Sequence, residues 1–365
     1  MSGPLAGVRI VELAGIGPVQ HAGMLLADLG ADIVRVDRES ATLQATETDI
    51  LGRGRRSVVL DLKNDAERQG LEQLLAHADV LLDPYRPGVL ERLGLDPGEL
   101  TERYPRLIVA RMTGWGQTGP LAHSAGHDIN YIALAGALGV IGPGDAEPVV
   151  PLNLVGDYGG GSVFLAYGVV AALYERERSG RGQVLDVAMV DGVASLMAAM
   201  FQLRASGGWR DGRARNWIQG AAPWYRAYAT SDRRHVAVGA LEPKFYALLL
   251  ELLGLDAAEW PQWDRSRWPA LAAELARIFA SRTRAEWSAR LGGTDVCFAA
   301  VLELDEVLDE EHLRARETFV ERDGVVQPAP CPRFSRTPGM IGARAPWPGQ
   351  HQTEVLAELE ETRPR

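Results

Sequence analysis

Cysteine and lysine are both scarce in this sequence. Only two of the 365 residues are cysteine, Cys297 and Cys331, which excludes a disulfide-stapled scaffold and a cysteine zinc site. Only Lys63 and Lys244 are lysine, so arginine supplies the rest of the 38 basic side chains. A single arginine is therefore weak evidence for a binding site. The scarcity of cysteine favours a reducing compartment, and we expect a cytoplasmic protein.

Excess positive charge and a long apolar run are also missing. The formal net charge is −10, which argues against a mainly electrostatic nucleic-acid binder. Charged residues, among them Arg9 and Glu12, interrupt the N-terminal part, which argues against a secretion signal. The uncharged stretch 158–174 has three consecutive glycines near its start and is shorter than the roughly 20 residues of a membrane span. We expect it to be a buried helix, and we expect no membrane partner.

The overall composition is that of a globular protein. Hydrophobic residues make up 46% and charged residues 24% of the chain, which excludes a disordered or fibrous protein. The length exceeds the roughly 100 to 200 residues of one typical domain. Two domains, or one large elaborated domain, are therefore expected.

Short apolar runs alternate with amphipathic stretches along the first half of the chain. Helices are predicted at 19–29 and 65–76, and strands at 8–13, 32–37, 57–62, 79–82 and 107–112. This alternation predicts an α/β fold with a largely parallel, doubly wound sheet.

The second half of the chain is less regular. Its pattern predicts a helix at 157–178, a strand at 183–187, a helix at 191–204 and a linker at 206–220. A segment with several helical stretches, from about 223 to 314, predicts a smaller second domain. The proline- and glycine-rich tail 325–349 is expected at the surface, before a last helix at 353–361.

The usual cofactor motifs are incomplete or missing. Gly15 and Gly17 follow a strand, and Asp37 ends the next one, as in a dinucleotide-binding fingerprint. The third glycine of that fingerprint is replaced by Gln20, and Pro18 follows Gly17. We therefore expect no nicotinamide or flavin. The sequence also has no Walker loop, paired-histidine zinc motif or serine nucleophile elbow.

Three segments carry side chains suited to proton transfer. His127 lies in the glycine-led segment 126–131, where it is either a titratable group or a structural histidine. Asp157 precedes glycines 159–161, either as a helix cap or as a carboxylate beside free helix-start N–H groups that favour a developing negative charge. Glu242, before Pro243, either starts a helix or orients a histidine across a domain or subunit boundary.

These segments, together with others along the chain, resemble the alpha-methylacyl-CoA racemases within the family III CoA-transferases. The resemblance covers nearly the whole chain. Its residues are 11–14, 34–38, 55–63, 113–120, 126–131, 152–154 with Asp157, 174–187, 239–243 and 305–307. Two positions depart from the family pattern: Glu39-Ser40 replaces the usual proline, and Gly156 precedes Asp157.

The resemblance implies an interlocked homodimer of a two-domain chain. A Rossmann-like large domain would comprise residues 1–205 and 325–365. A smaller α+β domain would comprise 221–315, with linkers at 206–220 and 316–324.

The resemblance also implies the activity. His127 and Asp157 would be the two acid/bases that interconvert (2R)- and (2S)-2-methylacyl-CoA thioesters, and Glu242, from the partner subunit, would assist His127. The chemistry is consistent, because an α-proton next to a thioester is weakly acidic and its removal requires a base and a stabilised enolate oxygen. Two bases on opposite faces invert the centre. The identity of the acyl group stays open.

The family pattern further assigns the contacts to CoA. The adenosine end would lie along Arg38 and the backbone of Leu60, Asp61, Leu62 and Lys63. The thioester end would lie along Gly126, Asp128, Ile129, Asn130 and Tyr131, and Arg86 and Arg92 are candidate phosphate partners. No metal and no cofactor besides the CoA of the substrate are expected.

Two other functions remain as alternatives. In a family III CoA-transferase, Asp157 would be the nucleophile that forms a mixed anhydride with the acyl group. His127 argues against this, because such transferases commonly carry tyrosine there. A non-catalytic acyl-CoA-binding module would have no use for His127, Asp157 and Glu242 together.

Overall fold

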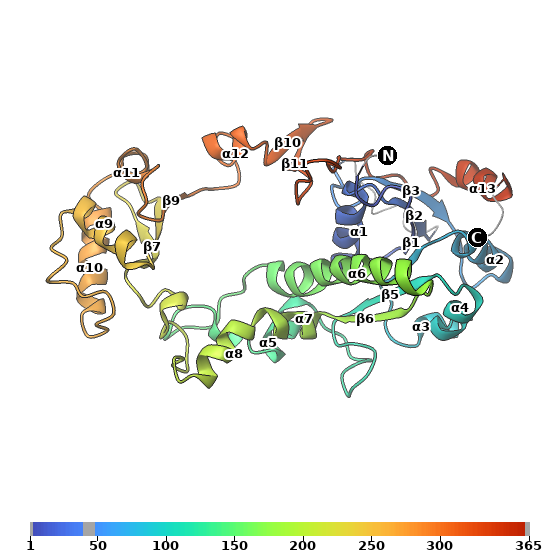
Figure 1. The fold of residues 1–365 in the computed structure, drawn as a ribbon, viewed down its shortest axis with the longest axis horizontal. Coiled ribbons are helices and arrows are strands. Elements are labelled where there is room, and N and C mark those ends of the chain that lie inside the picture. Colours follow the sequence, from blue (N-terminus) through green and yellow to red (C-terminus); the bar gives the residue numbers. More distant parts are fainter. Residues whose placement is uncertain (1–2, 39–47, 362–365) are drawn as a thin grey trace. The chain divides into compact units, whose positions relative to one another are not determined.

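The computed structural model describes residues 3–38 and 48–361 (Figure 1). The chain divides into two compact units. The first unit comprises residues 1–137, 151–198 and 315–365, and the second comprises 138–150 and 199–314. Glu39 and Ser40, where the sequence departs from the family pattern, lie outside the described residues.

The first unit is built on a six-stranded parallel sheet with the strand order β3-β2-β1-β4-β5-β6. The strands are β1 (Arg9–Leu13), β2 (Asp32–Asp37), β3 (Arg55–Val59), β4 (Val80–Asp83), β5 (Ile108–Thr113) and β6 (Val184–Ala188). The order reverses between β1 and β4, as in doubly wound folds. The prediction of a parallel, doubly wound α/β sheet is therefore confirmed.

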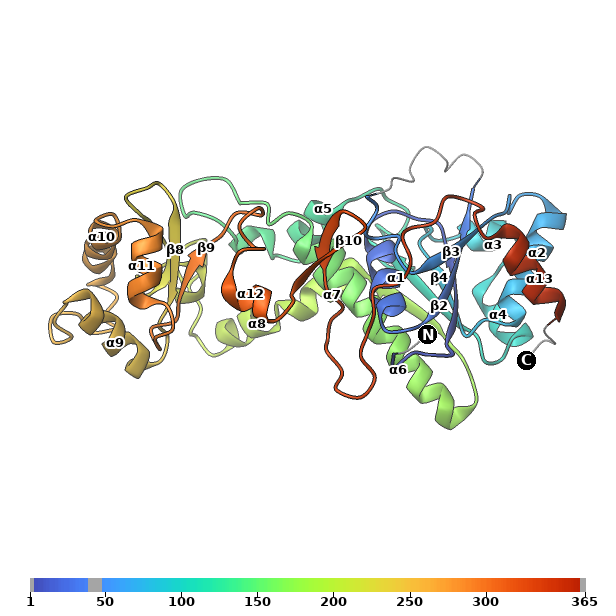
Figure 2. The same cartoon turned by 90° about the horizontal axis from the view of Figure 1, so that it is seen from above.

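Helices cover both faces of this sheet. Figure 2 shows α1 and α6 on one side of it and α2, α4 and α13 on the other. The helices of this unit are α1 (Pro18–Asp28), α2 (Asp65–Ala76), α3 (Val89–Arg92), α4 (Pro97–Arg103), α5 (Asp128–Leu134), α6 (Val163–Ser179), α7 (Met189–Leu196) and α13 (Gln352–Glu361). Because strand side chains alternate between the faces, neighbouring residues such as Ile10 and Val11 enter two separate apolar cores.

The strand β3 begins two residues before the predicted run 57–62 and ends three residues before its end. Its first residue, Arg55, is fully buried because its guanidinium donates a hydrogen bond of 2.9 Å to Glu12 of β1. The pattern of apolar residues in the sequence does not indicate that a charged residue begins a buried strand. Along its outer edge, Val59 N–H donates to the Gln352 side chain at 2.8 Å and Ser57 N–H to His351 Nδ1 at 3.2 Å.

A π-helix, η3 (Leu154–Ser162), leads directly into α6. Together they form the helix Leu154–Ser179, which among the described residues is the only one long and apolar enough, by length and composition, to cross a membrane. One third of its most apolar window is buried. We expected a buried helix, but the structure buries only one face. The opposite face exposes Val163, Tyr167, Val170 and Tyr174.

The glycines of η3 are packing positions. A Cβ on Gly192 of α7 would lie 1.9 Å from the backbone oxygen of Gly160, and a Cβ on Gly160 would lie 2.9 Å from Val193. Glycine therefore lets α7 lie directly against η3. The predicted helix 191–204 is in fact two helices, α7 and α8 (Ala198–Ala205), which are separated at Met197.

The rest of the first unit comes from the C-terminal part of the chain. The strands β10 (Phe319–Arg322) and β11 (Val325–Pro328) form an antiparallel hairpin, which the sequence did not predict. The predicted last helix is confirmed as α13.

The second unit is mainly helical around a small antiparallel sheet. The sheet has the order β7-β8-β9, formed by Tyr225–Ala229, His235–Gly239 and Phe298–Val301. Trp224, Phe279 and Trp287 are buried in its core. The helices are α9 (Pro243–Leu253), α10 (Trp268–Phe279) and α11 (Arg284–Leu291), and α12 (Glu311–Ala315) ends at the boundary between the units. Residues 206–220, expected as a linker, lie in this unit and include a short 3₁₀-helix at Trp217–Gln219.

Candidate active site

A cavity of about 410 Å³ opens at the carboxyl ends of β1, β4 and β5 in the first unit. Its walls are the segments that follow these strands, residues 14–19, 84–87 and 112–115, together with His127, Tyr131 and Asp157. The strand order reverses between β1 and β4, which is where open α/β sheets form their ligand-binding crevice. The cavity is therefore our candidate active site.

His127 stands immediately before α5. Its backbone N–H donates to Asn130 Oδ1 at 3.0 Å, and its carbonyl accepts from Asn130 N–H at 2.8 Å. These two bonds fix the backbone at the helix start. The side chain is exposed and lines the cavity, so the imidazole is accessible to a ligand and to solvent protons.

Asp157 reaches the same cavity from η3. Its carboxylate is half-buried and accepts a hydrogen bond of 3.3 Å from Asn153 Nδ2. Burial raises the pKa of Asp157 above the usual value of 3.8, and the negative charge of Asp128 raises it further. The Asn153 hydrogen bond and the charge of His127 oppose these effects without cancelling them. Asp157 is thus a stronger base than an exposed aspartate.

Two of the helix-start N–H groups beside Asp157 already have an acceptor in the chain. We expected the N–H groups at this helix start to stabilise a developing negative charge, and these two are not free to do so. The N–H groups of Gly156 and Asp157 donate to Asp128 Oδ2 at 2.7 and 2.8 Å. Gly160 and Gly161, expected to admit a ligand, are instead buried beside α7.

Tyr131 forms part of the cavity wall. A Cβ on Gly114 would lie 2.1 Å from the Tyr131 ring, and a Cβ on Gly126 would lie 2.7 Å from it, so both positions leave room for this side chain. Trp115 packs edge-on against the ring at 4.8 Å. Burial raises the pKa of Tyr131, and the charge of Asp157 adds to this, so the phenol keeps its proton.

The five residues expected at the thioester end are only partly brought together. Gly126 and Tyr131 line the cavity, whereas Asp128, Ile129 and Asn130 do not. Sequence reasoning did not single out Tyr85, Met112, Trp115 and Met189, which also line it. Most of these follow or end a parallel strand, and their position at the carboxyl edge is the signal that could have found them.

The residues expected at the adenosine end also lie near the carboxyl edge of the sheet. Arg38 follows β2, is exposed and lies 5.6 Å from the centre of the Tyr85 ring. Leu60 and Leu62 are buried, while Asp61 and Lys63 are exposed.

Two N–H groups in the 60–63 segment have partners in the chain. Asp61 N–H donates to Glu67 at 2.7 Å, and Lys63 N–H donates to Asp61 Oδ1 at 3.0 Å. Because these two N–H groups are already bonded, the carbonyl oxygens and side chains of the segment are more available to a ligand than they are.

The two candidate phosphate partners are both exposed. Arg86 follows β4 and lines the cavity, whereas Arg92 ends α3 and does not. The structure therefore associates Arg86 with the candidate site more directly than Arg92.

Glu242 belongs to the second unit. It precedes α9, is exposed and makes no side-chain cap to that helix. Burial of Cys297 raises the pKa of its thiol, and the charge of Glu242 adds to this, so Glu242 lies near Cys297 within the second unit. Of the three predicted catalytic residues, His127 and Asp157 line the cavity of the first unit, and Glu242 belongs to the second unit.

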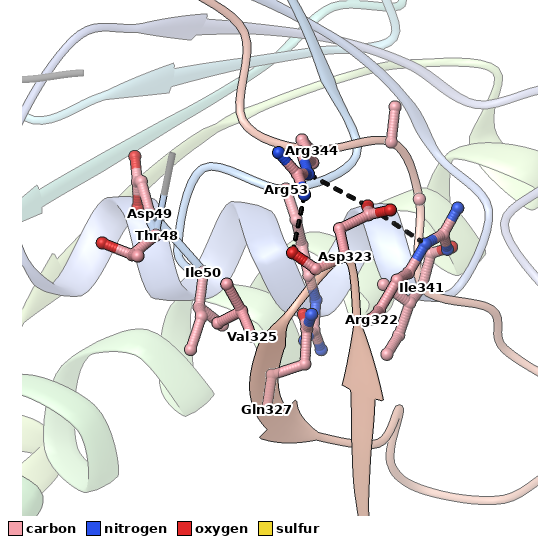
Figure 3. Close-up of a pocket in the computed structure, with 12 residues that line it drawn as sticks. Thr48, Asp49, Ile50, Arg53, Arg322, Asp323, Val325, Gln327, Ile341 and Arg344 are labelled. Atoms are coloured by element: carbon pink, nitrogen blue, oxygen red, sulfur yellow. Dashed lines mark hydrogen bonds and ion pairs between the residues drawn. The ribbon is translucent and has the colours of Figure 1, made fainter. Parts of the chain in front are cut away.

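A second, much smaller cavity lies beside the β10–β11 hairpin (Figure 3). Its volume of about 20 Å³ is barely enough for one water molecule. Arg53 binds Asp28 and Gln327, and Arg344 binds Asp323. Because these arginines already have partners in the chain, we assign no ligand to this cavity.

A groove of about 580 Å³ lies near the opposite edge of the sheet, beside α13. Its Arg56 forms ion pairs with Asp32, Glu354 and Glu358. These pairs join α13 to β2 and β3, so we interpret the groove as structural. Across residues 3–38 and 48–361, no cluster of three or more His, Cys, Asp or Glu side chains is arranged to hold a metal ion.

Comparison with known proteins gives one consistent family. Residues 5–352 match the model of CoA-transferase family III. The chain is 46% identical over 357 residues to an alpha-methylacyl-CoA racemase of Mus musculus and 42% identical over 360 residues to that of Homo sapiens, in each case over 97% of this chain and 93% of the relative. A crystal structure of a CAIB/BAIF family protein from Brucella suis superposes with a TM-score of 0.85 at 25% identity, covering 98% of this chain and 100% of that one.

Proposed function

Because the chain belongs to CoA-transferase family III, we propose that it is a racemase that interconverts the (2R) and (2S) forms of 2-methylacyl-CoA thioesters. The observation that carries this proposal is that His127 and Asp157 line one cavity. The racemases of mouse and man, similar over nearly the whole chain, support the choice of reaction.

In the proposed reaction, the two side chains hold one proton between them. One removes the α-proton from one face of the thioester, and the other delivers a proton to the opposite face of the enolate. In the reverse direction they exchange roles. The enolate oxygen needs a donor, and the protonated hydroxyl of Tyr131 is available in the same cavity wall. Arg86, exposed at this cavity, is a partner for the phosphates of CoA.

The direct test starts from one enantiomer of a 2-methylacyl-CoA in deuterated water. Both stereochemistry and α-deuterium are followed with time. A racemase yields both enantiomers, and deuterium enters as the centre inverts. If the substrate keeps its configuration and its α-proton, the proposal is wrong.

A CoA-transferase reaction is the second candidate, because the family and the position of Asp157 in the cavity are both compatible with it. In that reaction the Asp157 carboxylate attacks the thioester carbonyl, CoA leaves as the thiolate and a mixed anhydride forms. Hydroxylamine that attacks the Asp157 carbonyl of this anhydride would leave an aspartyl hydroxamate and inactivate the enzyme, whereas attack at the acyl carbonyl would release an acyl hydroxamate and regenerate the carboxylate. We expect no inactivation and no aspartyl adduct, and we expect no CoA transfer to free carboxylates above background.

The pH dependence should reflect the environment of Asp157. The reactive state carries one proton on the His127–Asp157 pair, so kcat/KM should fall at low pH, when the pair binds a second proton, and at high pH, when it loses both. Because burial raises the pKa of Asp157, the low-pH limb should lie above pH 3.8. Initial rates from both enantiomers across the pH range measure this. A low-pH limb at or below 3.8 would contradict the assignment of Asp157.

We also propose a homodimer in which the partner's Glu242 assists His127. The family resemblance supports this, and so does the exposed apolar face of α6, since a contiguous apolar patch of this kind marks an interaction surface. Light scattering should give the mass of two chains, and activity should be lost when dilution yields monomers. A fully active monomer would exclude this role for Glu242.

A cytoplasmic location and a reaction without metal or redox cofactor stay predictions.

A further inference from the structure

The start of η3 has N–H groups that the helix itself does not use. In a π-helix each N–H bonds to the carbonyl five residues earlier, so the first residues lack a helical acceptor. The first bond of this kind here runs from Tyr158 N–H to the Asn153 carbonyl at 3.3 Å. The two preceding N–H groups, of Gly156 and Asp157, both donate to Asp128 Oδ2. Asp128 therefore caps the helix segment that carries Asp157.

Glycine at position 156 makes this cap possible. A Cβ at that position would lie 2.5 Å from Asp128 Oδ2 and 3.2 Å from the Asp128 backbone. Any other side chain would push the carboxylate away from the two N–H groups. Gly156, a departure from the family pattern in the sequence, thus has a specific role beside Asp128.

Asp128 is also the neighbour of the other acid/base. It is the first residue of α5, directly after His127, and only 6% of its surface is exposed. Its backbone position is tied to that of His127, whose own N–H and carbonyl bind Asn130 at the same helix start. One buried carboxylate thus connects the backbone beside His127 to the backbone of Asp157.

On the basis of the proposed racemase function, we propose that Asp128 is a positioning residue whose carboxylate sets the separation of His127 and Asp157. Proton transfer to opposite faces of one carbon requires both side chains to be placed accurately, and a displacement of about 1 Å can cost roughly 10²-fold in rate. Two hydrogen bonds of 2.7 and 2.8 Å to a buried acceptor hold the Gly156–Asp157 peptide in a single orientation.

The charge of Asp128 has a second, separable effect. It raises the pKa of Asp157, in opposition to His127. The other titratable or charged groups facing this region are Tyr131 of α5, Arg86, whose charge acts on Tyr131, and His21 of α1. The His21 ring is tilted against that of Tyr158, with the ring centres 4.5 Å apart. Removing the charge while keeping the hydrogen bonds should therefore lower the pKa of Asp157 without displacing it.

Three variants test the proposal with enantiopure 2-methylacyl-CoA. Asp128→Ala removes the acceptor, and we expect kcat to fall roughly 10²-fold while KM changes less than about three-fold. Asp128→Asn keeps an acceptor oxygen, so it should retain kcat within about ten-fold, and its low-pH limb should move to lower pH. Gly156→Ala keeps the charge but displaces the carboxylate, and its loss of kcat should resemble that of Asp128→Ala.

Asp96→Ala is the matched control. Asp96 also caps a helix through two N–H groups, those of Gly98 and Glu99 at 2.8 and 3.2 Å, but at α4 and outside the cavity wall. Its loss should lower the melting temperature and leave kcat unchanged. Circular dichroism gives the folded fraction by which each kcat is corrected.

The outcomes separate this inference from the proposed function. If the wild-type protein does not racemise the substrate, the proposed function fails. If it does, but folded Asp128→Ala or Gly156→Ala retains full kcat, only the positioning role is wrong. Should Asp128→Ala not fold, Gly156→Ala and the pH profile of Asp128→Asn still decide. An unshifted low-pH limb in Asp128→Asn contradicts the predicted effect of the charge.

Discussion

Replacing His127 with alanine should lower the rate of racemisation by roughly 10²- to 10⁴-fold, the usual contribution of a general acid or base. The imidazole is exposed in the cavity, and its backbone is fixed at the start of α5. Inversion needs proton transfer on both faces, so the loss of one base stops it even when the other is intact. KM should change little, because His127 does not hold the phosphates of CoA.

The control for this variant is His123→Ala. His123 is exposed in the same loop but does not line the cavity. The His123→Ala variant loses an imidazole of the same kind, and its rate of racemisation should stay at the wild-type level. Initial rates from each enantiomer are measured by chiral separation of the hydrolysed acids. Near-wild-type racemisation by His127→Ala would remove His127 from the mechanism.

Replacing Asp157 with asparagine should abolish inversion and leave exchange on one face. The substitution removes the base but keeps the size of the side chain. The hydrogen bond to the Asp128 carboxylate is donated by the backbone N–H of residue 157, so it does not depend on the side chain that is replaced. His127 can then still remove and return the proton on its own face. One enantiomer should therefore take up deuterium slowly while keeping its configuration, a pattern that neither loss of folding nor loss of binding produces.

A nuclear magnetic resonance time course in deuterated water, combined with chiral analysis, distinguishes the possible results. Full racemisation by Asp157→Asn would exclude Asp157 as a base. A hydroxylamine-trapped adduct on the wild-type protein, formed in step with turnover, would instead identify Asp157 as a nucleophile and favour the transferase reaction.

The parallel sheet could be predicted because apolar runs of strand length recur between amphipathic stretches. The structure confirms β2 over the predicted 32–37 and α2 over the predicted 65–76. The prediction for β3 was displaced because a charged residue, Arg55, is buried there through a partner 43 positions away in the chain. Pairing over such distances leaves no periodic signal in the sequence.

Other features depend on contacts that only the fold creates. The π-helical start of the 154–179 helix has no compositional mark, and the break at Met197 interrupts an apolar pattern that reads as continuous. Residues 138–150 belong to the second unit although they lie between two segments of the first. Nothing local in the sequence indicates that this segment belongs to a different unit from its neighbours in the chain.

The candidate site was partly predictable from the local composition of the sequence. His127 and Asp157 stand in segments of unusual composition, and both line the cavity. The segment around His127 also contains Asp128, but its bond to the N–H groups 28 and 29 residues further along requires η3 and α5 to be side by side. The sequence therefore indicated the acid/base groups but not what holds them.

The C-terminal segment closes one edge of the parallel sheet. Edge strands carry unpaired backbone groups that recruit strands from other molecules. On β3, the N–H groups of Ser57 and Val59 are occupied by the side chains of His351 and Gln352, and the Ser57 carbonyl accepts from His351 N–H at 3.0 Å. The sheet therefore cannot lengthen through this edge. A chain cut before His351 would expose it, so proteolytic trimming at this end would convert a protected edge into a site of aggregation.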